Sequence, residues 1–466
     1  MIPAAWRAGE VAVIGLGKSG RSVAALLRRE GIKVYVSDAG RSAVLDDAAA
    51  TLRALGADVD VGSHDLERIA RASVVVASPG VPPNAPPLAA ARDANVPVVG
   101  EIEVALHFLP KTRSIAVTGT NGKTTTTALI GHLLRALGED AVDAGNIGTP
   151  LAELALRSEP PAWTALELSS FQLHDTPSIR PDVGVVTNLG PDHLDRYASA
   201  DDYYADKARL MANANAGSKW VLNADDAEVL ALHRRLPGAS RTASLPGHTW
   251  KFSLRGRDAD AWYDRERDML MALGAPLIPR RDLALFGDHN VANTLAAALA
   301  VMVGDRGKQT PAARGAIAAG IRNFRALKHR LEVAGEPGGV LWINDSKATN
   351  VGSTLVAVQG MTRPTILLLG GRHKGEPYTA LVEPLRRIGK KVLAYGESAP
   401  IIESDLGGLV PLERLGSSFP DVIARARALA EPGDVVLLSP ACSSYDMFNN
   451  YEERGAEFKR LALATA

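Results

Sequence analysis

The run from Val117 to Thr125, V-T-G-T-N-G-K-T-T, has the composition and spacing of a phosphate-binding loop. In such a loop, backbone N–H groups and the positive end of the following helix attract phosphate oxygens. Lys123 can reach the terminal phosphates of a nucleotide, and the Thr124 hydroxyl can ligate Mg²⁺. Gly119 and Gly122 lack the Cβ atoms that would block this approach. The run predicts an ATP site; the alternative is a glycine-rich turn with an incidental lysine.

The flanking residues predict the elements that position this loop. The apolar run 114–117 is typical of a short buried strand. The segment 126–137 predicts a helix with one apolar face, formed by Leu129, Leu133, Leu134 and Leu137. A strand, a glycine turn and a helix in this order form a phosphate site.

Further strand-like runs alternate with helical patterns along the whole chain. They cover 11–14, 33–37, 74–77, 164–167, 183–188, 340–343, 365–369, 391–395 and 435–438. Such alternation favours parallel sheets in an α/β fold. An alanine-rich helix is expected over 291–302, and residues 236–285 show short β-like pieces with no recognisable chemistry. Since 466 residues exceed one ordinary core, we expect three domains, at 1–110, 111–327 and 328–466.

Composition excludes several classes of protein. Hydrophobic residues make up 46% of the chain, so large cores can form. Lys+Arg and Asp+Glu both number 52, which argues against a chain-wide nucleic-acid surface. One cysteine excludes an internal disulfide framework and a cysteine-based zinc site. The chain shows no signal peptide and no apolar run of the ~20 residues that a membrane span needs. We expect a cytoplasmic protein without a membrane span.

Near the N-terminus, Gly15, Gly17 and Gly20 follow a strand, and Asp38 ends the next strand. This pattern fits a dinucleotide fingerprint, although the glycines report only a close approach of backbone to a diphosphate. A nicotinamide cofactor and a purely structural turn stay open. We favour a nucleotide-diphosphate substrate, because an ATP loop follows further along the chain.

Three side chains of the second domain have both a chemical and a structural interpretation. Glu167 ends a strand and can hold Mg²⁺, or it can cap the next helix. His193, in the run N-L-G-P-D-H-L-D-R, is a candidate metal ligand or a structural histidine. From spacing alone, Lys207 is a solvated lysine on a helix.

In the third domain, three polar loops follow strands, at 344–350, 369–374 and 438–446. Ligands bind outside the carboxyl ends of parallel strands, so three such loops on one edge would form one pocket. Cys442 is most simply a small buried residue, since no paired histidine marks it as a nucleophile.

Taken together, these motifs resemble the Mur ligase family of peptidoglycan synthesis. The motifs are GTNGKTTT, GNIG, ELSSFQL, NLGPDHLDRY, NDSKATN, LLLGGRHKG and LSPACSSYDMF, in that order over nearly the whole chain. The resemblance is closest to the members that add D-glutamate to UDP-N-acetylmuramoyl-L-alanine. It implies an N-terminal Rossmann-like domain, a central P-loop ATPase-like domain and a C-terminal Rossmann-like domain.

The resemblance also implies ligands for each substrate. The UDP-sugar ligands are Gly17, Lys18, Ser19, Asp38, Ser78, Gly80 and Asn146. The ATP ligands are Gly119, Thr120, Asn121, Gly122, Lys123, Thr124, Thr125, Asn290, Asn293, Arg330 and Asp345. The glutamate ligands are Lys347, Thr349, Lys374, Ser443, Ser444 and Tyr451. Tyr451 stands where the family often has Phe, and Tyr445 replaces a smaller apolar residue.

For catalysis, the resemblance implies Lys123, Glu167, His193 and Lys207. Two Mg²⁺ ions would be held by Thr124, Glu167, His193 and Lys207. Lys207 matches a lysine that the family carbamylates with CO₂; a carbamate supports Mg²⁺, whereas an ammonium repels it. The implied reaction forms an acyl phosphate from ATP, which the amine of D-glutamate attacks. The expected partners are the UDP-sugar, D-glutamate and ATP, with no nucleic acid, and we expect a monomer.

Three other functions compete with this hypothesis. Another ligase of the family would add a diamino acid, or glutamate to folate, and a substrate panel distinguishes it. An NAD-dependent oxidoreductase would change nicotinamide absorbance. A nucleotide-binding regulator would bind ATP without releasing phosphate.

Overall fold

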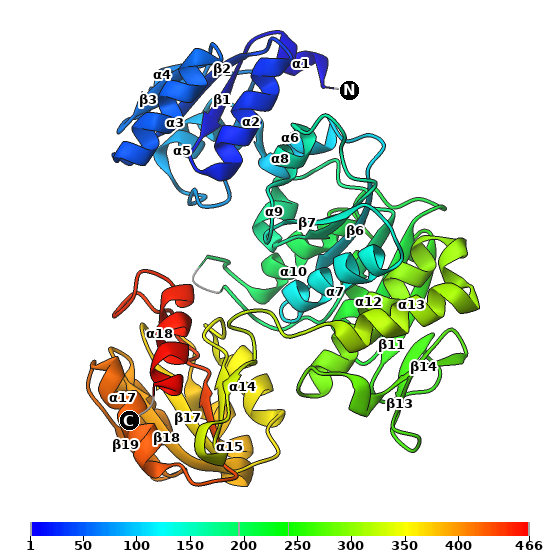
Figure 1. Ribbon diagram of the computed structural model, residues 1–466. Coiled ribbons are helices and arrows are strands. Elements are labelled where there is room, and N and C mark those ends of the chain that lie inside the picture. Colours follow the sequence, from blue (N-terminus) through cyan, green and yellow to red (C-terminus); the bar gives the residue numbers. More distant parts are fainter. Residues whose placement is uncertain (1, 194–195, 241, 465–466) are drawn as a thin grey trace. The chain divides into compact units, whose positions relative to one another are not determined.

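The computed structural model describes residues 2–193, 196–240 and 242–464 (Figure 1). Its strands form three sheets of five, nine and six strands. One sheet falls in each predicted domain, and the predicted three-part α/β fold is confirmed. The chain divides into two compact units: Met1–Ile278 with Asn293–Ile321, and Pro279–Ala292 with Arg322–Ala466. The domain edges at 110 and 327 stay predictions.

The first sheet is parallel, with the order β3-β2-β1-β4-β5. Its strands are β1 (Glu10–Ile14), β2 (Lys33–Asp38), β3 (Asp58–Val61), β4 (Val74–Ala77) and β5 (Val98–Gly100). Its helices are α1 (Ala4–Arg7), α2 (Lys18–Arg29), α3 (Ala43–Ala54), α4 (Leu66–Ile69) and α5 (Pro86–Asp93). The strand order reverses between β1 and β4, which is where such sheets bind ligands.

The central sheet has the order β14-β13-β12-β11-β10-β9-β6-β8-β7. The strands are β6 (Arg113–Thr118), β7 (Ala141–Gly145), β8 (Trp163–Glu167), β9 (Val183–Val186), β10 (Lys219–Asn223), β11 (His248–Ser253), β12 (Ala261–Asp264), β13 (Met269–Ala272) and β14 (Ala275–Pro279). The helices are α7 (Lys123–Ala136), α8 (Leu151–Ala155), α9 (Ser170–His174), α10 (Ala200–Ala208), α11 (Ala227–Ala231), α12 (Asp288–Gly304) and α13 (Pro311–Asn323). The β-like pieces of 236–285 are β11 to β14, which extend this sheet.

The third sheet has the order β15-β16-β20-β17-β18-β19, and only β15 is antiparallel to its neighbour. The strands are β15 (Glu332–Gly335), β16 (Leu341–Asn344), β17 (Thr365–Gly370), β18 (Gly389–Tyr395), β19 (Leu412–Arg414) and β20 (Val435–Leu438). The helices are α14 (Val351–Gln359), α15 (Val382–Ile388), α16 (Ala399–Leu406), α17 (Phe419–Leu429) and α18 (Tyr451–Leu463). Among the described residues, no helix is both long and apolar enough to cross a membrane.

Helix α6 (Glu101–Leu106) follows β5 and carries two buried carboxylates. Glu101 accepts a hydrogen bond of 2.5 Å from the backbone N–H of Ala152, in the first turn of α8. Glu103 accepts from the N–H and hydroxyl of Ser178, at 3.0 and 2.8 Å. These bonds fix the first sheet's last helix to the segments that flank β8. Burial raises the pKa of Glu101 to about 7.

We predict that Glu101 makes stability depend on pH. The folded pKa lies above the unfolded value of about 4.3, so this carboxyl group makes the fold less stable as pH rises through that interval. Glu101→Gln keeps an acceptor oxygen but does not titrate. Its stability relative to the wild type should therefore increase from about pH 5 to about pH 8, by on the order of 1 kcal/mol or more. Calorimetric unfolding measures this, with the exposed Glu67→Gln in α4 as control. A difference that does not change with pH contradicts the prediction.

Candidate active site

The phosphate loop leaves β6 and enters α7, as predicted. Helix α7 begins at Lys123 rather than at 126, because Gly122 caps it with a φ of 82°. A Cβ on Gly122 would lie 2.3 Å from Asn293 Oδ1, and one on Gly119 would lie 2.0 Å from Thr187 Oγ1. The two glycines thus admit neighbouring protein side chains as well as a ligand. The first turn of α7 then contains the predicted ligands Lys123, Thr124 and Thr125.

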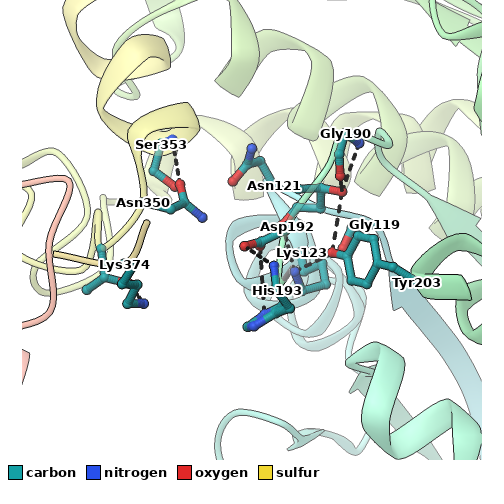
Figure 2. A network of polar contacts seen from close by, with 12 residues as sticks. Gly119, Asn121, Lys123, Gly190, Asp192, His193, Tyr203, Asn350, Ser353 and Lys374 are labelled. Carbon is teal, nitrogen blue, oxygen red and sulfur yellow. Dashed lines mark hydrogen bonds and ion pairs between the residues drawn. The ribbon is translucent and has the colours of Figure 1, made fainter. Parts of the chain in front are cut away.

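The segment that follows β9 forms hydrogen bonds with the phosphate loop (Figure 2). The Asn188 amide accepts from Asn121 N and donates to Asn121 O, both at 2.9 Å. Thr120 Oγ1 donates to Gly190 O at 2.9 Å and accepts from Gly190 N at 3.0 Å. The loop is therefore fixed before a nucleotide binds. Asn188 was not predicted as a site residue, although it begins the N-L-G-P-D-H run.

Lys207 is not the solvated lysine that its spacing suggests. The residue is 1% exposed, and its Nζ donates to Gly119 O at 2.7 Å. Lys123 Nζ donates to the same carbonyl at 3.0 Å and to Thr120 O at 2.8 Å. Burial, followed by the nearby charge of Lys123, lowers the pKa of Lys207 well below its ordinary value. The prediction from spacing is wrong because the tertiary fold covers this face of α10.

Tyr203, one helical turn before Lys207, is a further residue of the site that sequence analysis missed. Its ring centroid lies 4.4 Å from Lys207 Nζ, and its hydroxyl donates to Thr120 Oγ1 at 3.4 Å. The spacing of four residues along a helix could have indicated the pair. Tyr203 thus connects α10 to the phosphate loop.

Glu167 ends β8, and its carboxylate group is buried. Its Oε1 accepts from Asn146 Nδ2 at 2.7 Å, while Oε2 is buried and has no hydrogen-bond partner among the described residues. The side chain is 1% exposed. A buried, unpaired carboxylate oxygen is costly unless a cation or a donor binds it. Together with the Thr124 hydroxyl in the loop, this oxygen fits the preference of Mg²⁺ for oxygen ligands.

His193 has a left-handed backbone, with a φ of 55°. Its Nε2 lies 3.8 Å from Asp192 Oδ2 (Figure 2). Its ring meets the Phe171 ring edge-on, with the centroids 5.3 Å apart. The side chain is 43% exposed. Leu194 and Asp195 of the same motif lie outside the described residues. Among the described residues, no group of three His, Cys, Asp or Glu side chains is arranged to hold a metal ion.

Both predicted adenine ligands lie in the first half of α12. Asn293 is buried beside Gly122 of the phosphate loop. Asn290 is buried as well, and its Nδ2 donates to Phe286 O at 2.8 Å.

All predicted UDP-sugar ligands except Asn146, which follows β7 of the central sheet, gather at the carboxyl edge of the first sheet. Gly17, Lys18 and Ser19 lie where α2 begins, and Ser78 and Gly80 follow β4. The Ser78 hydroxyl donates to Gly15 O at 3.4 Å, across the point where the strand order reverses. Asp38 accepts from Leu16 N and Gly40 N, both at 2.8 Å. Asp38 thus shapes the glycine turn, and each of its oxygens has one lone pair left for a ligand.

In the second unit, Asp345 is buried at the end of β16. It accepts from Leu331 N at 3.2 Å and from the Ser439 hydroxyl at 2.8 Å. Burial raises the pKa of Asp345 to about 7, while the Ser439 hydrogen bond and the charge of Arg330 oppose the rise. Arg330 and Asp345, the two predicted ATP ligands of this unit, therefore lie close together.

The three polar loops of the third sheet follow β16, β20 and β17, which are adjacent strands. Lys374 Nζ donates to Thr349 Oγ1 at 3.2 Å, and Lys347 Nζ lies 5.0 Å from the Tyr451 ring centroid. Ser443 and Arg372 form a backbone bridge between two of the loops. Ser444 is buried beside Ser443. The predicted glutamate ligands thus lie on one edge of one sheet, as expected.

Arg454 of α18 is a buried residue of this region that sequence analysis missed. Its guanidinium donates to the Ser346 hydroxyl at 2.9 Å and to Cys442 O at 3.1 Å, and the side chain is fully buried. It therefore connects the loop after β16 to the loop after β20. An arginine in an amphipathic helix gives no sequence signal for such a role.

A phosphate loop, a buried acid beside it and three α/β sheets define a multidomain nucleotide-dependent enzyme. Three family descriptions match the chain: "Mur ligase MurD-like, N-terminal domain" at residues 9–100, "Mur ligase middle domain" at 117–301, and "Mur ligase, glutamate ligase domain" at 329–442. The chain therefore belongs to the Mur ligase family.

Similar proteins cover almost the whole chain. It is 43% identical to a UDP-N-acetylmuramoylalanine–D-glutamate ligase of Anaeromyxobacter dehalogenans, over 98% of both chains. Identity is 42% to the ligase of the same name from Chromobacterium violaceum, over 96% of both. Among solved structures, the chain resembles UDP-N-acetylmuramate–alanine ligase of Thermotoga maritima with a TM-score of 0.59 and 20% identity, over 97% of this chain and 98% of that one. This last likeness supports the fold alone.

Asp206, next to Lys207, anchors α10 to its surroundings. Its carboxylate accepts from His174 Nδ1 at 2.8 Å, from Arg209 Nε at 3.0 Å and from the Tyr197 hydroxyl at 3.0 Å. The hydrogen bond to Asp206 raises the pKa of His174. The position of the helix that carries Lys207 thus depends on this carboxylate.

We predict that Asp206→Ala destabilises the protein by about 1–2 kcal/mol, because the half-buried Tyr197 and Arg209 and the exposed His174 lose their acceptor. The part that depends on His174 is present below about pH 6.5 and is lost as pH rises through the raised folded pKa. Chemical unfolding near pH 6 and near pH 9 measures both effects. Asp201→Ala, at an exposed position of α10, is the control. Equal losses for the two variants would contradict the prediction.

Proposed function

We propose that this chain is an ATP-dependent ligase that joins D-glutamate to UDP-N-acetylmuramoyl-L-alanine in peptidoglycan precursor synthesis. The main support is the arrangement around the phosphate loop, where Glu167 Oε2 is buried and has no hydrogen-bond partner among the described residues. The full-length similarity to proteins named UDP-N-acetylmuramoylalanine–D-glutamate ligase supports this choice of substrates.

Mg²⁺ would be held by Thr124, Glu167 and His193, with Lys207 as a fourth ligand once it carries a carboxylate. The ions would offset negative charge on the phosphates. The proposal includes two ions, in line with the family resemblance. The unpaired Glu167 oxygen supports a cation at this place.

Lys207 is suited to carbamylation because burial lowers the pKa of its amine and so favours the neutral form. A neutral amine can attack CO₂ at carbon, with loss of one proton, to give a carbamate anion. The fold supplies the neutral amine by burying it and by placing Lys123 nearby. The same burial would make an unmodified cation costly at this position.

The chain's own groups then have distinct tasks. The loop N–H groups and Lys123 would orient the γ-phosphate toward the alanyl carboxylate of the UDP-sugar, which makes an acyl phosphate. Asn146, fixed by Glu167, would contact the sugar substrate near that carboxylate. Lys347, Lys374, Thr349, Ser443, Ser444 and Tyr451 would hold D-glutamate. Its amine would attack the acyl carbon, and phosphate would leave from a tetrahedral intermediate.

The test is phosphate release from ATP and Mg²⁺ with UDP-N-acetylmuramoyl-L-alanine, with D-glutamate, L-glutamate, L-lysine or meso-diaminopimelate in parallel. We expect release only with D-glutamate. Lys123→Ala should lose at least about a hundredfold in turnover while UDP-sugar affinity stays unchanged, since Lys123 contacts phosphate and not sugar. Release with another amino acid would change the substrate assignment within the family. No release with any of them would sink the proposed function.

A further inference from the structure

A series of hydrogen bonds in the third domain connects two loops proposed to bind the amino acid. His373 Nδ1 lies 3.0 Å from the Tyr378 hydroxyl oxygen, which lies 3.0 Å from Cys442 Sγ. The Cys442 thiol donates to Ser398 Oγ at 3.4 Å. Tyr378, Cys442 and Ser398 are fully buried, and His373 is half-buried. We name these four residues the buried relay.

Two members of the buried relay directly precede proposed amino-acid ligands. His373 directly precedes Lys374, whose Nζ donates to Thr349 Oγ1. Cys442 directly precedes Ser443, whose backbone pairs with Arg372. Side-chain and backbone contacts therefore join the same two loops.

The two central groups of the relay, the Tyr378 hydroxyl and the Cys442 thiol, stay protonated at neutral pH. Burial raises the pKa of the Tyr378 hydroxyl and that of the Cys442 thiol. Tyr378 has one hydroxyl proton and lies between two partners, so it donates to one of them and accepts from the other. Its phenyl ring is part of the apolar core, next to residues such as Leu381 and Val382. The hydroxyl can therefore be removed without removing the packing.

We infer that His373 and Tyr378 are positioning residues for the incoming amino acid, because they hold the loop of Lys374 in register with the loop of Ser443. They would act on amino-acid affinity and not on ATP or UDP-sugar affinity. This inference rests on the proposed ligase function.

Steady-state rates of phosphate release, with each of the three substrates varied in turn, test the inference. Tyr378→Phe should raise KM for D-glutamate about three- to tenfold, the effect of losing one hydrogen bond between neutral groups. KM for ATP and for the UDP-sugar should stay within about twofold. His373→Ala should act in the same direction, and the double variant should be no worse than the stronger single one. Thr365→Val removes another fully buried hydroxyl of the same domain, at the start of β17 and outside the relay, and should leave all three constants unchanged.

Two results would overturn the inference while the ligase function stands. In the first, Tyr378→Phe and His373→Ala bind D-glutamate as the wild type does. In the second, both variants unfold at lower temperature and raise all three KM values together, which indicates a structural role only. Wild-type protein without D-glutamate-dependent turnover would instead refute the ligase function, and the inference with it.

Discussion

The burial of the Lys207 amine against the carbonyl oxygen of Gly119 is the interaction on which the central site depends. It places the Lys207 amine, whose pKa burial lowers, on the Gly119 carbonyl that also accepts a hydrogen bond from Lys123. A buried ammonium at this place would face another cation and lack a carboxylate partner at ion-pair distance among the described residues, so the fold favours the neutral amine. The rest of the site follows from this constraint: Tyr203 covers the amine, Asp206 holds its helix, and Glu167 lies near enough to act on its charge.

The parallel sheets explain how residues far apart in sequence reach common sites. In the central sheet, β6 lies between β8 and β9, so the loops after these three strands carry Lys123, Glu167 and His193 to one edge. In the third sheet, β16, β20 and β17 are neighbours, and the loops that follow them carry Asp345, Ser443 and Lys374. Each site therefore depends on strand order rather than on any single motif.

Local patterns predicted the parts that need only short-range information. The glycine turn before α7 and the strands β1, β4, β6, β8 and β20 follow from apolar runs and breakers. The start of α7 was placed three residues late, because Gly122 caps the helix in a conformation that periodicity does not show. The strands β3 and β5 are short and were not predicted. Tertiary contacts, which spacing along one helix cannot reveal, account for three further features. These are the burial of Lys207, the hydrogen bond between His174 and Asp206, and the position of Arg454 between two loops.

We propose that the buried amine of Lys207 becomes a carbamate anion that supports Mg²⁺. The direct measurement is carbon NMR of protein that was depleted of CO₂ and then returned to ¹³C-labelled bicarbonate, with Lys207→Ala as the reference. The account predicts one labelled carbamate carbon in the wild type and none in the variant. It also predicts that D-glutamate-dependent phosphate release falls on depletion and recovers with the label. Full activity with an unmodified Lys207 would contradict it.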